Sequence, residues 1–240
     1  MFGYAEEITE GYPAIRAGVI HATGVANGPS PPALIDDYRA EQRLAAARLE
    51  ATPIADIASI GAWRRAFSRF GAKPTQYRSA PEALLRRLSK QGDLPAINTL
   101  VDAGNLVSIR YAVPVAAFDL ANIAGAITVR LAAGDEAFSD LGSSATVSPD
   151  RGEVVFVDDD NVVCARRWCW RQSATSATGP KTSEALLVVE ALHETADEDV
   201  QAASGDIVEL MSAHQPQAQF TSYLLSPAAP STESGERSNT

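Results

Sequence analysis

The stretch Leu94–Leu131, LPAINTLVDAGNLVSIRYAVPVAAFDLANIAGAITVRL, decides the fold expected for this chain. Its first half repeats apolar side chains at helical spacing, which predicts a helix that faces a core: Leu100, Val101, Val107 and Tyr111. Pro114 ends that helix, because proline lacks an N–H and restricts the residue before it. Alternating apolar residues over Ile127–Leu131 then predict a half-buried strand.

Three helices are predicted ahead of this stretch. The first runs from Asp36 to Glu50, with Asp36 as its cap and Leu44 and Leu49 on its inner side. Thr52-Pro53 opens the second, since a threonine cap followed by proline suits a first turn, and Gly71 ends it.

The third helix starts at a Ser79–Glu82 capping box and ends at Gly92. In such a box the serine hydroxyl accepts a hydrogen bond from an early helix N–H and the glutamate reaches back to the cap. A short strand over Ala14–Ala22 precedes all three helices.

Strands dominate the rest of the chain. They are predicted at Glu153–Val157, Val162–Trp170, Ala185–Leu192 and Gln219–Leu225, with one helix over Asp197–Ala213. Helices followed by antiparallel strands indicate an α+β fold, with N-terminal helices packed on a mixed, largely antiparallel β-sheet in a single globular domain. We expect a strand, loop and helical N-terminal extension over residues 1–60, the main domain over 61–225 and a disordered tail over 226–240.

Composition narrows the class of protein. Of 240 residues, 45% are hydrophobic, which is enough for a sizeable core, and no run of about 18 apolar residues predicts a membrane span. The acidic N-terminus lacks a signal-peptide pattern, so a cytoplasmic location is expected. The two cysteines, Cys164 and Cys169, are expected to be reduced, and the three histidines form no metal-ligand spacing, so no metal and no cofactor is predicted.

Charge is unevenly distributed. The net charge of −10 argues against non-specific binding of DNA. Between residues 61 and 90, however, eight basic residues stand against the single acid Glu82: Arg64, Arg65, Arg69, Lys73, Arg78, Arg86, Arg87 and Lys90. A basic face on an acidic body suits a structured polyanion, although a solvated helix face without a partner explains the same pattern.

Two separated motifs carry a family resemblance. The first is INTLVD at 97–102 with Asn105 and, after the turn, PVAAFDL at 114–120; the second is RRWCWR at 166–171. Together they resemble the editing and tRNA-binding domain of the bacterial phenylalanyl-tRNA synthetase beta subunit, and more closely the free-standing proteins that carry this domain alone. The resemblance covers roughly Trp63–Leu192 and implies a tRNA partner, which is expected to be aminoacylated.

The resemblance also implies site residues. Glu190, a carboxylate inside the apolar run LLVVEAL, would line the pocket that recognises the wrong amino acid, and Asn105 would hold a water or a ribose hydroxyl; these are the candidate catalytic residues. An edge position for Glu190 and a simple helix–turn hydrogen bond for Asn105 are the plainer alternatives. The basic residues between 61 and 90 would hold the tRNA body. The other candidates, for substrate binding, are Asn98, Asp102, Asp119, Arg166, Arg167, Trp168, Trp170 and Arg171.

Alternatives remain for several of these residues. Asp102 also fits a structural tie to a loop, and Asp119 a cap for the segment after it. In the predicted strand, one side carries Arg167, Cys169 and Arg171, and the other carries Arg166, Trp168 and Trp170. These arginines and tryptophans suit a terminal adenosine and its phosphates, or the carboxylate or acyl group of a small ligand, although Arg stems packed over Trp rings explain the same pattern.

The chain departs from the synthetase domain at two places. Ala116 stands where that domain has a histidine, and the segment 166–171 replaces a glycine-rich pocket loop. Three interpretations follow: a trans-editing deacylase for mischarged tRNA, a non-catalytic RNA-binding module, or a pocket protein for a free amino acid or acyl metabolite. No ATP-binding motif is present, so ligase activity is not expected.

Overall fold

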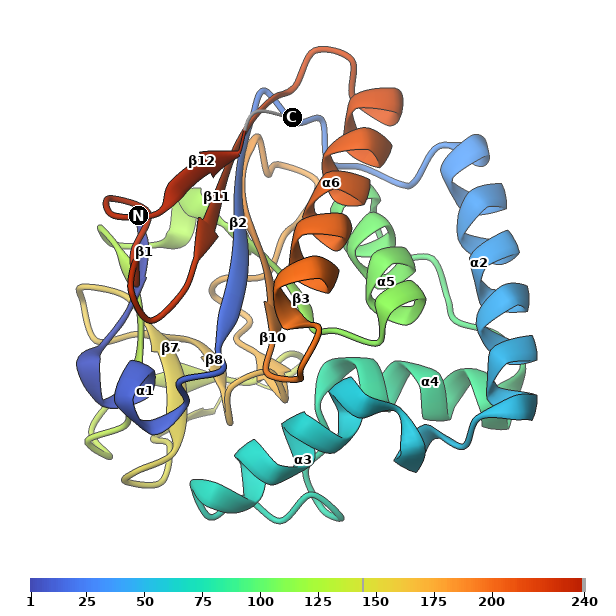
Figure 1. The fold of residues 1–240 in the computed structure, drawn as a ribbon. Coiled ribbons are helices and arrows are strands. Elements are labelled where there is room, and N and C mark those ends of the chain that lie inside the picture. Colours follow the sequence, from blue (N-terminus) through green and yellow to red (C-terminus); the bar gives the residue numbers. More distant parts are fainter. Residues whose placement is uncertain (144, 239–240) are drawn as a thin grey trace.

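Two five-stranded sheets face each other in the computed structural model, which describes residues 1–143 and 145–238 (Figure 1). The first sheet is antiparallel throughout, in the order β12 (Glu236–Ser238), β11 (Gln219–Leu225), β2 (Arg16–Thr23), β10 (Glu184–Ala191) and β3 (Val115–Asp119). The order in the second is β1 (Phe2–Tyr4), β4 (Ile127–Leu131), β7 (Val154–Val157), β8 (Val163–Arg166) and β9 (Arg171–Gln172), with β1 parallel to β4. A small ribbon pairs β5 (Phe138–Ser139) with β6 (Thr146–Val147).

Helices cover the outer face of the first sheet (Figure 1). α5 (Thr99–Tyr111) and α6 (Ala196–His214) lie on the strands, and α2 (Pro32–Ala51) and α4 (Ala80–Gln91) pack against α5. α3 (Ala58–Arg69) and the short α1 (Glu6–Gly11) instead contribute apolar side chains to the core between the sheets. The predicted α+β class, with helices on a mixed, largely antiparallel sheet, is confirmed.

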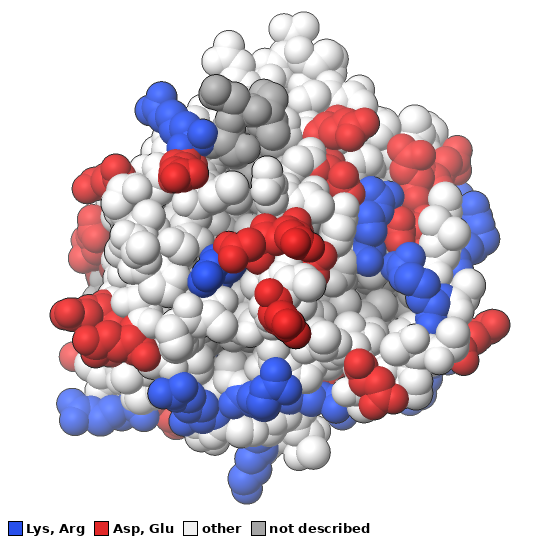
Figure 2. Space-filling model, in the orientation of Figure 1, with Lys and Arg blue, Asp and Glu red and all other residues white. Residues whose placement is uncertain are grey.

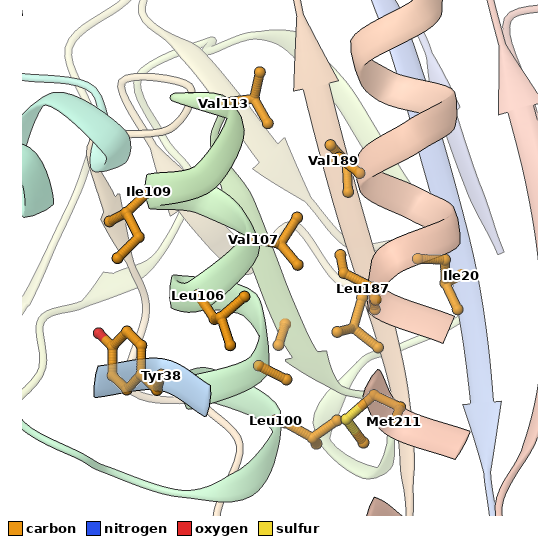
Figure 3. Close-up of a cluster of buried hydrophobic side chains, with 14 of the residues drawn as sticks. Ile20, Tyr38, Leu100, Leu106, Val107, Ile109, Val113, Leu187, Val189 and Met211 are labelled. Atoms are coloured by element: carbon orange, nitrogen blue, oxygen red, sulfur yellow. The ribbon is translucent and has the colours of Figure 1, made fainter. Parts of the chain in front are cut away.

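The alternation of β10 divides the core in two. Leu187 and Val189 face the helices and meet Val107 of α5 and Met211 of α6 in the cluster of Figure 3. The intervening residues of β10 face the second sheet, because successive strand side chains point to opposite faces. Glu190 belongs to that second set, so the strand turns a carboxylate toward the space between the sheets.

Several predicted helix starts are wrong. α2 begins at Pro32 rather than at Asp36, and Leu44 is 58% exposed rather than inward-facing. Thr52 ends α2, and a short 3-10 turn over Ile54–Asp56 follows before α3 begins at Ala58. Prolines favour the first turn of a helix, so Pro32 and Pro53 each compete with the polar residue beside them for the role of start signal.

The Ser79–Glu82 capping box does not form. Ser79 precedes α4 but its side chain makes no cap hydrogen bond, and the Glu82 carboxylate accepts hydrogen bonds from Arg64 and Arg86 instead. Three hydrogen bonds from charged guanidinium groups outweigh one bond from a backbone N–H, which explains why the glutamate turns away from the cap.

The predicted strand 162–170 stops early. β8 ends at Arg166, and Arg167 and Trp168 take left-handed backbone conformations with φ of 45° and 58°. The alternation expected for Arg166–Arg171 is therefore wrong, since a turn reverses the chain between Arg166 and β9. Left-handed φ is unfavourable for residues with a Cβ, so contacts elsewhere must hold this turn.

The chain ends are part of the fold. β2, from the segment expected to be an extension, lies between β10 and β11 in the first sheet. In the segment expected to be a disordered tail, β12 pairs with β11, while residues 239 and 240 lie outside the described part. No helix in the described residues has the length and apolar character to cross a membrane.

Candidate active site

Glu190 lies near the end of β10 with its side chain between the two sheets, where it is only 3% exposed. The Tyr4 hydroxyl donates a hydrogen bond of 2.6 Å to Glu190 Oε1, and the Trp168 indole N–H donates one of 2.9 Å to the same oxygen. Among the residues the structure describes, none donates a hydrogen bond to Oε2. One oxygen is thus fixed by the protein and the other remains available for a ligand.

The environment of Glu190 sets its protonation near neutrality. Burial raises the pKa of Glu190 from 4.5 to about 7, and the hydrogen bonds from Trp168 and Tyr4 act in the opposite direction. Burial also raises the pKa of Tyr4, and the nearby Glu190 charge raises it further, so Tyr4 stays a donor. A carboxyl with a pKa near 7 can bind a cation when ionised or exchange a proton with water.

A pocket opens beside Glu190, with a cavity volume of about 90 Å³. Its residues come from the start of α4, from β3 and the proline before it, from β7, β8, β9 and β10, and from the turn between β8 and β9. Most of them are apolar: Ala80, Pro114, Val115, Ala116, Phe156, Ala165, Trp168, Cys169, Trp170, Arg171, Gln172, Val188 and Glu190. Apolar walls around one carboxylate oxygen suit a ligand with a hydrocarbon body and a polar hydrogen-bond donor.

The turn at Arg167–Trp168 builds the floor of this pocket. The Trp168 backbone N–H donates a 2.7 Å bond to the Val154 carbonyl, and the buried indole meets Trp63 and Tyr12 edge to face at 5.1 and 4.8 Å. Aromatic pairs of this geometry and the bond to Glu190 offset the strained backbone. Trp168 therefore acts as a support for the carboxylate rather than as an exposed stacking surface.

Each arginine of segment 166–171 forms an ion pair with an acidic side chain. Buried Arg166 forms a two-bond pair with Glu153, at 2.9 and 2.8 Å. Arg167 reaches Asp150 at 3.1 Å. Half-exposed Arg171 pairs with an acid too, Asp140, while its guanidinium lies 4.6 Å over the Trp170 ring.

This pairing separates the segment into two parts. Arg171, Trp168 and Trp170 reach the Glu190 pocket. Arg166 and Arg167 instead serve to fix the turn, because the Arg167 backbone N–H also bonds Glu153 Oε1, at 2.9 Å.

The polar stripe of α5 lies on the other side of the first sheet. Asn98 caps the helix by accepting from the Val101 N–H at 3.0 Å. Asp102 accepts from the Ser30 hydroxyl at 2.5 Å, which ties the helix to a loop. Asn105 lies beside the Tyr38 hydroxyl of α2, so the structure does not bring it to Glu190.

Asp119 has a structural position as well. It caps the turn Leu120–Asn122 by accepting from the Ala121 N–H at 3.1 Å, and its second oxygen accepts from the Thr182 hydroxyl at 2.7 Å. These contacts agree with the alternative in which Asp119 is a cap.

The basic residues of α3, α4 and the connector between them divide into two sets. Arg64, Arg78 and Arg86 surround the buried Glu82 carboxylate. The remaining five are exposed: Arg65, Arg69, Lys73, Arg87 and Lys90. In Figure 2, basic side chains form a row along the lower edge of the molecule, over and beside α3, while acidic ones gather above. Other basic side chains lie among the acidic ones above this row, so the charges are only partly segregated on this face.

Sequence reasoning missed Tyr4. A tyrosine in strand β1, 186 positions before Glu190, gives no local signal, and the pairing of β1 with β4 brings it to the site. Both cysteines are free, with Cys164 buried and Cys169 at the pocket. Within residues 1–143 and 145–238, no three His, Cys, Asp or Glu side chains gather as a metal-binding group.

A family model and a curated relative agree with the motifs. A family model described as the B3/4 domain matches residues 62–204. The phenylalanine–tRNA ligase beta subunit of Fusobacterium nucleatum subsp. nucleatum is 34% identical over 91 residues, which are 38% of this chain but 11% of that protein. An N-terminal fragment of the phenylalanyl-tRNA synthetase beta subunit from Pyrococcus horikoshii superposes with a TM-score of 0.46 at 11% identity, covering 92% of this chain and 50% of that chain.

Proposed function

The chain belongs to the B3/4 domain family, whose model matches more than half of its length, and on this premise we propose that it binds tRNA and receives the aminoacyl end in the Glu190 pocket. The observation that carries the proposal is a buried carboxylate that lines an apolar pocket and whose Oε2 receives no hydrogen bond from any described residue. The exposed cations of α3, α4 and the connector between them would hold the RNA backbone, since phosphate contacts supply most non-specific affinity.

The reaction proposed at this pocket is hydrolysis of a mischarged aminoacyl ester. The oxygen of a water molecule bonds to the ester carbonyl carbon, the bond from that carbon to the ribose oxygen breaks, and the ribose oxygen takes up a proton. Glu190 would bind the amino acid's ammonium or hydroxyl through Oε2, or take the proton of the attacking water. The walls formed by Val115, Ala116 and Val188 would select the side chain by size.

Release of labelled amino acid from a panel of correctly and wrongly charged tRNAs tests the proposal. We expect release from at least one mischarged species and loss of that release in Glu190→Gln, which keeps the shape of the side chain but not its charge. Asn105→Ala is the matched control: Asn105 packs beside Tyr38 across the sheet, so the variant should retain release within about twofold. Equal release by the native protein and Glu190→Gln would contradict the role of the carboxylate.

A second candidate, a tRNA-binding module without hydrolysis, has one specific observation in its favour. Ala116 lines the pocket at the position where a histidine would be expected from the resemblance, so the pocket offers Glu190 as its carboxylate and no imidazole. Absence of release from every charged tRNA, together with salt-sensitive tRNA binding, would establish this candidate. Absence of both would point instead to a free amino acid or acyl metabolite as the ligand.

A further inference from the structure

Three arginines converge on one carboxylate at the junction of α3 and α4. Arg64 binds Glu82 through two bonds of 3.0 and 2.7 Å, and Arg86 donates a bond of 2.7 Å to Oε1. Arg78 Nε lies 3.9 Å from the same oxygen. With three positive charges for one negative, the cluster has two positive charges in excess.

The charge of the cluster is fixed. Burial raises the pKa of Glu82, but the hydrogen bonds from Arg64 and Arg86 and their charges outweigh it, so the pKa is lowered from the usual value. The carboxylate is therefore ionised near neutral pH and holds Arg64 and Arg86 in place, but it does not neutralise the group.

A hollow lies against this cluster, with a cavity volume of about 270 Å³. Besides the four charged residues, Pro74 and Thr75 line it. The arginine side chains are accessible there, at 28% exposure for Arg64, 41% for Arg78 and 45% for Arg86. Arg78 Nε is itself buried and, within the described part of the chain, has no hydrogen-bond partner. Glu82 Oε1, at 3.9 Å, is too far to accept a hydrogen bond from this N–H, so Glu82 holds Arg78 less tightly than it holds Arg64 and Arg86.

We propose that this hollow binds one phosphate group through Arg64, Arg78 and Arg86. Guanidinium groups are planar forks whose N–H pairs match phosphate oxygens, and three of them can serve three oxygens at once. The excess of two positive charges matches the one to two negative charges of a phosphodiester or phosphate monoester.

The hollow is close to the Glu190 pocket. Ala80, which stands between Arg78 and Glu82, lines that pocket, and its N–H donates a 2.9 Å bond to the Cys169 carbonyl. A ligand whose polar end enters the pocket would thus place a phosphate against the arginines on the other side of the same turn. This assignment rests on the proposed function: the hollow would bind a backbone phosphate near the aminoacyl end of tRNA. Free phosphate is the other source of the same chemistry.

The test compares Arg78→Ala with Arg87→Ala, which removes an exposed cation of α4 that does not line the hollow. Neither side chain is needed for the bonds that hold Glu82, so both variants should fold, as circular dichroism would verify. We expect Arg78→Ala to weaken tRNA binding about tenfold and to lower the slope of log K against log salt by about one. The loss of tRNA affinity in Arg87→Ala should be several-fold smaller.

Titration with inorganic phosphate gives the second readout. It should shift the NMR signal of the Arg78 Nε–H in the native protein and in Arg87→Ala. A phosphate shift without any special loss of tRNA affinity in Arg78→Ala would assign the hollow to free phosphate and overturn its role in RNA binding. Equal losses in the two variants with no phosphate shift would overturn the site, while the proposed function would stand. If the protein binds no tRNA but phosphate still shifts the Arg78 signal, the phosphate site would stand and the proposed tRNA-binding function would be overturned.

Discussion

Glu190 should make the stability of this protein fall as pH rises. Its carboxyl has a pKa of about 7 in the folded state, against the usual 4.5, so the folded protein holds a proton that the unfolded chain has already released. Stability falls with pH wherever the folded state binds more protons, and here that window runs from about 4.5 to about 7. Integration between about pH 5 and about pH 8 gives a loss of about 2.5 kcal/mol from this one group.

Urea unfolding of the native protein and Glu190→Gln across this pH range measures the effect. Glutamine does not titrate, so the difference in unfolding free energy between the two proteins should change by about 2.5 kcal/mol with pH, whatever other groups contribute. Glu209→Gln, on the exposed face of α6, is the matched control and should follow the native curve. A constant difference between the native protein and Glu190→Gln would refute the assignment of a raised pKa to this carboxyl.

Two further changes test the surroundings of Glu190 and the turn beneath it. Tyr4→Phe removes a hydrogen bond that lowers the pKa of Glu190, so the pH window of the stability loss should extend above 7, as the same urea series would detect; an unchanged window would contradict the role of Tyr4. Glu153→Gln leaves the buried Arg166 guanidinium without its carboxylate and should cost about 3–5 kcal/mol of unfolding free energy, whereas Asp150→Asn, at an 85% exposed side chain, should cost less than about 1 kcal/mol. Equal losses in these two variants would refute the distinction between the buried Glu153 carboxylate and the exposed Asp150 carboxylate.

Periodicity predicted the parts of the fold in which each residue's environment depends on its neighbours in sequence. α5, α6 and the buried strand β10 follow from apolar spacing, because burial of one face is what stabilises them. Helix starts were less predictable, since several polar residues and prolines compete for the same cap. The choice among them depends on long-range partners, such as Arg64 for Glu82.

The candidate site was half predictable for the same reason. Glu190 was predictable as a site residue because a carboxylate in an apolar run needs a hydrogen-bond partner, and the structure supplies two. The partners themselves, Tyr4 and Trp168, could not be found locally: one comes from the first strand of the chain, and the other depends on a left-handed turn with no glycine to mark it. Asn105 was wrongly predicted as a site residue: it shares a helical stripe with Asn98 and Asp102, and that stripe lies on the far side of the sheet from Glu190, where Asn105 lies beside Tyr38 of α2.

The two faces of the first sheet therefore differ in what they contribute: one packs the apolar core and the other forms the candidate site. On the helix side, Leu187 and Val189 meet a close-packed apolar core, and the polar groups of α5 satisfy backbone and loop atoms. On the other side, the two sheets meet around Glu190, a group whose burial costs stability at neutral pH and whose second oxygen is left for a ligand. A ligand with a cationic or donor group would recover part of that cost on binding, which links the pH dependence of stability to the affinity of the pocket. Ligand-induced stabilisation should accordingly be larger at about pH 7 than at about pH 5 if the ligand is a cation, and thermal unfolding with an amino acid ester at both values would decide this.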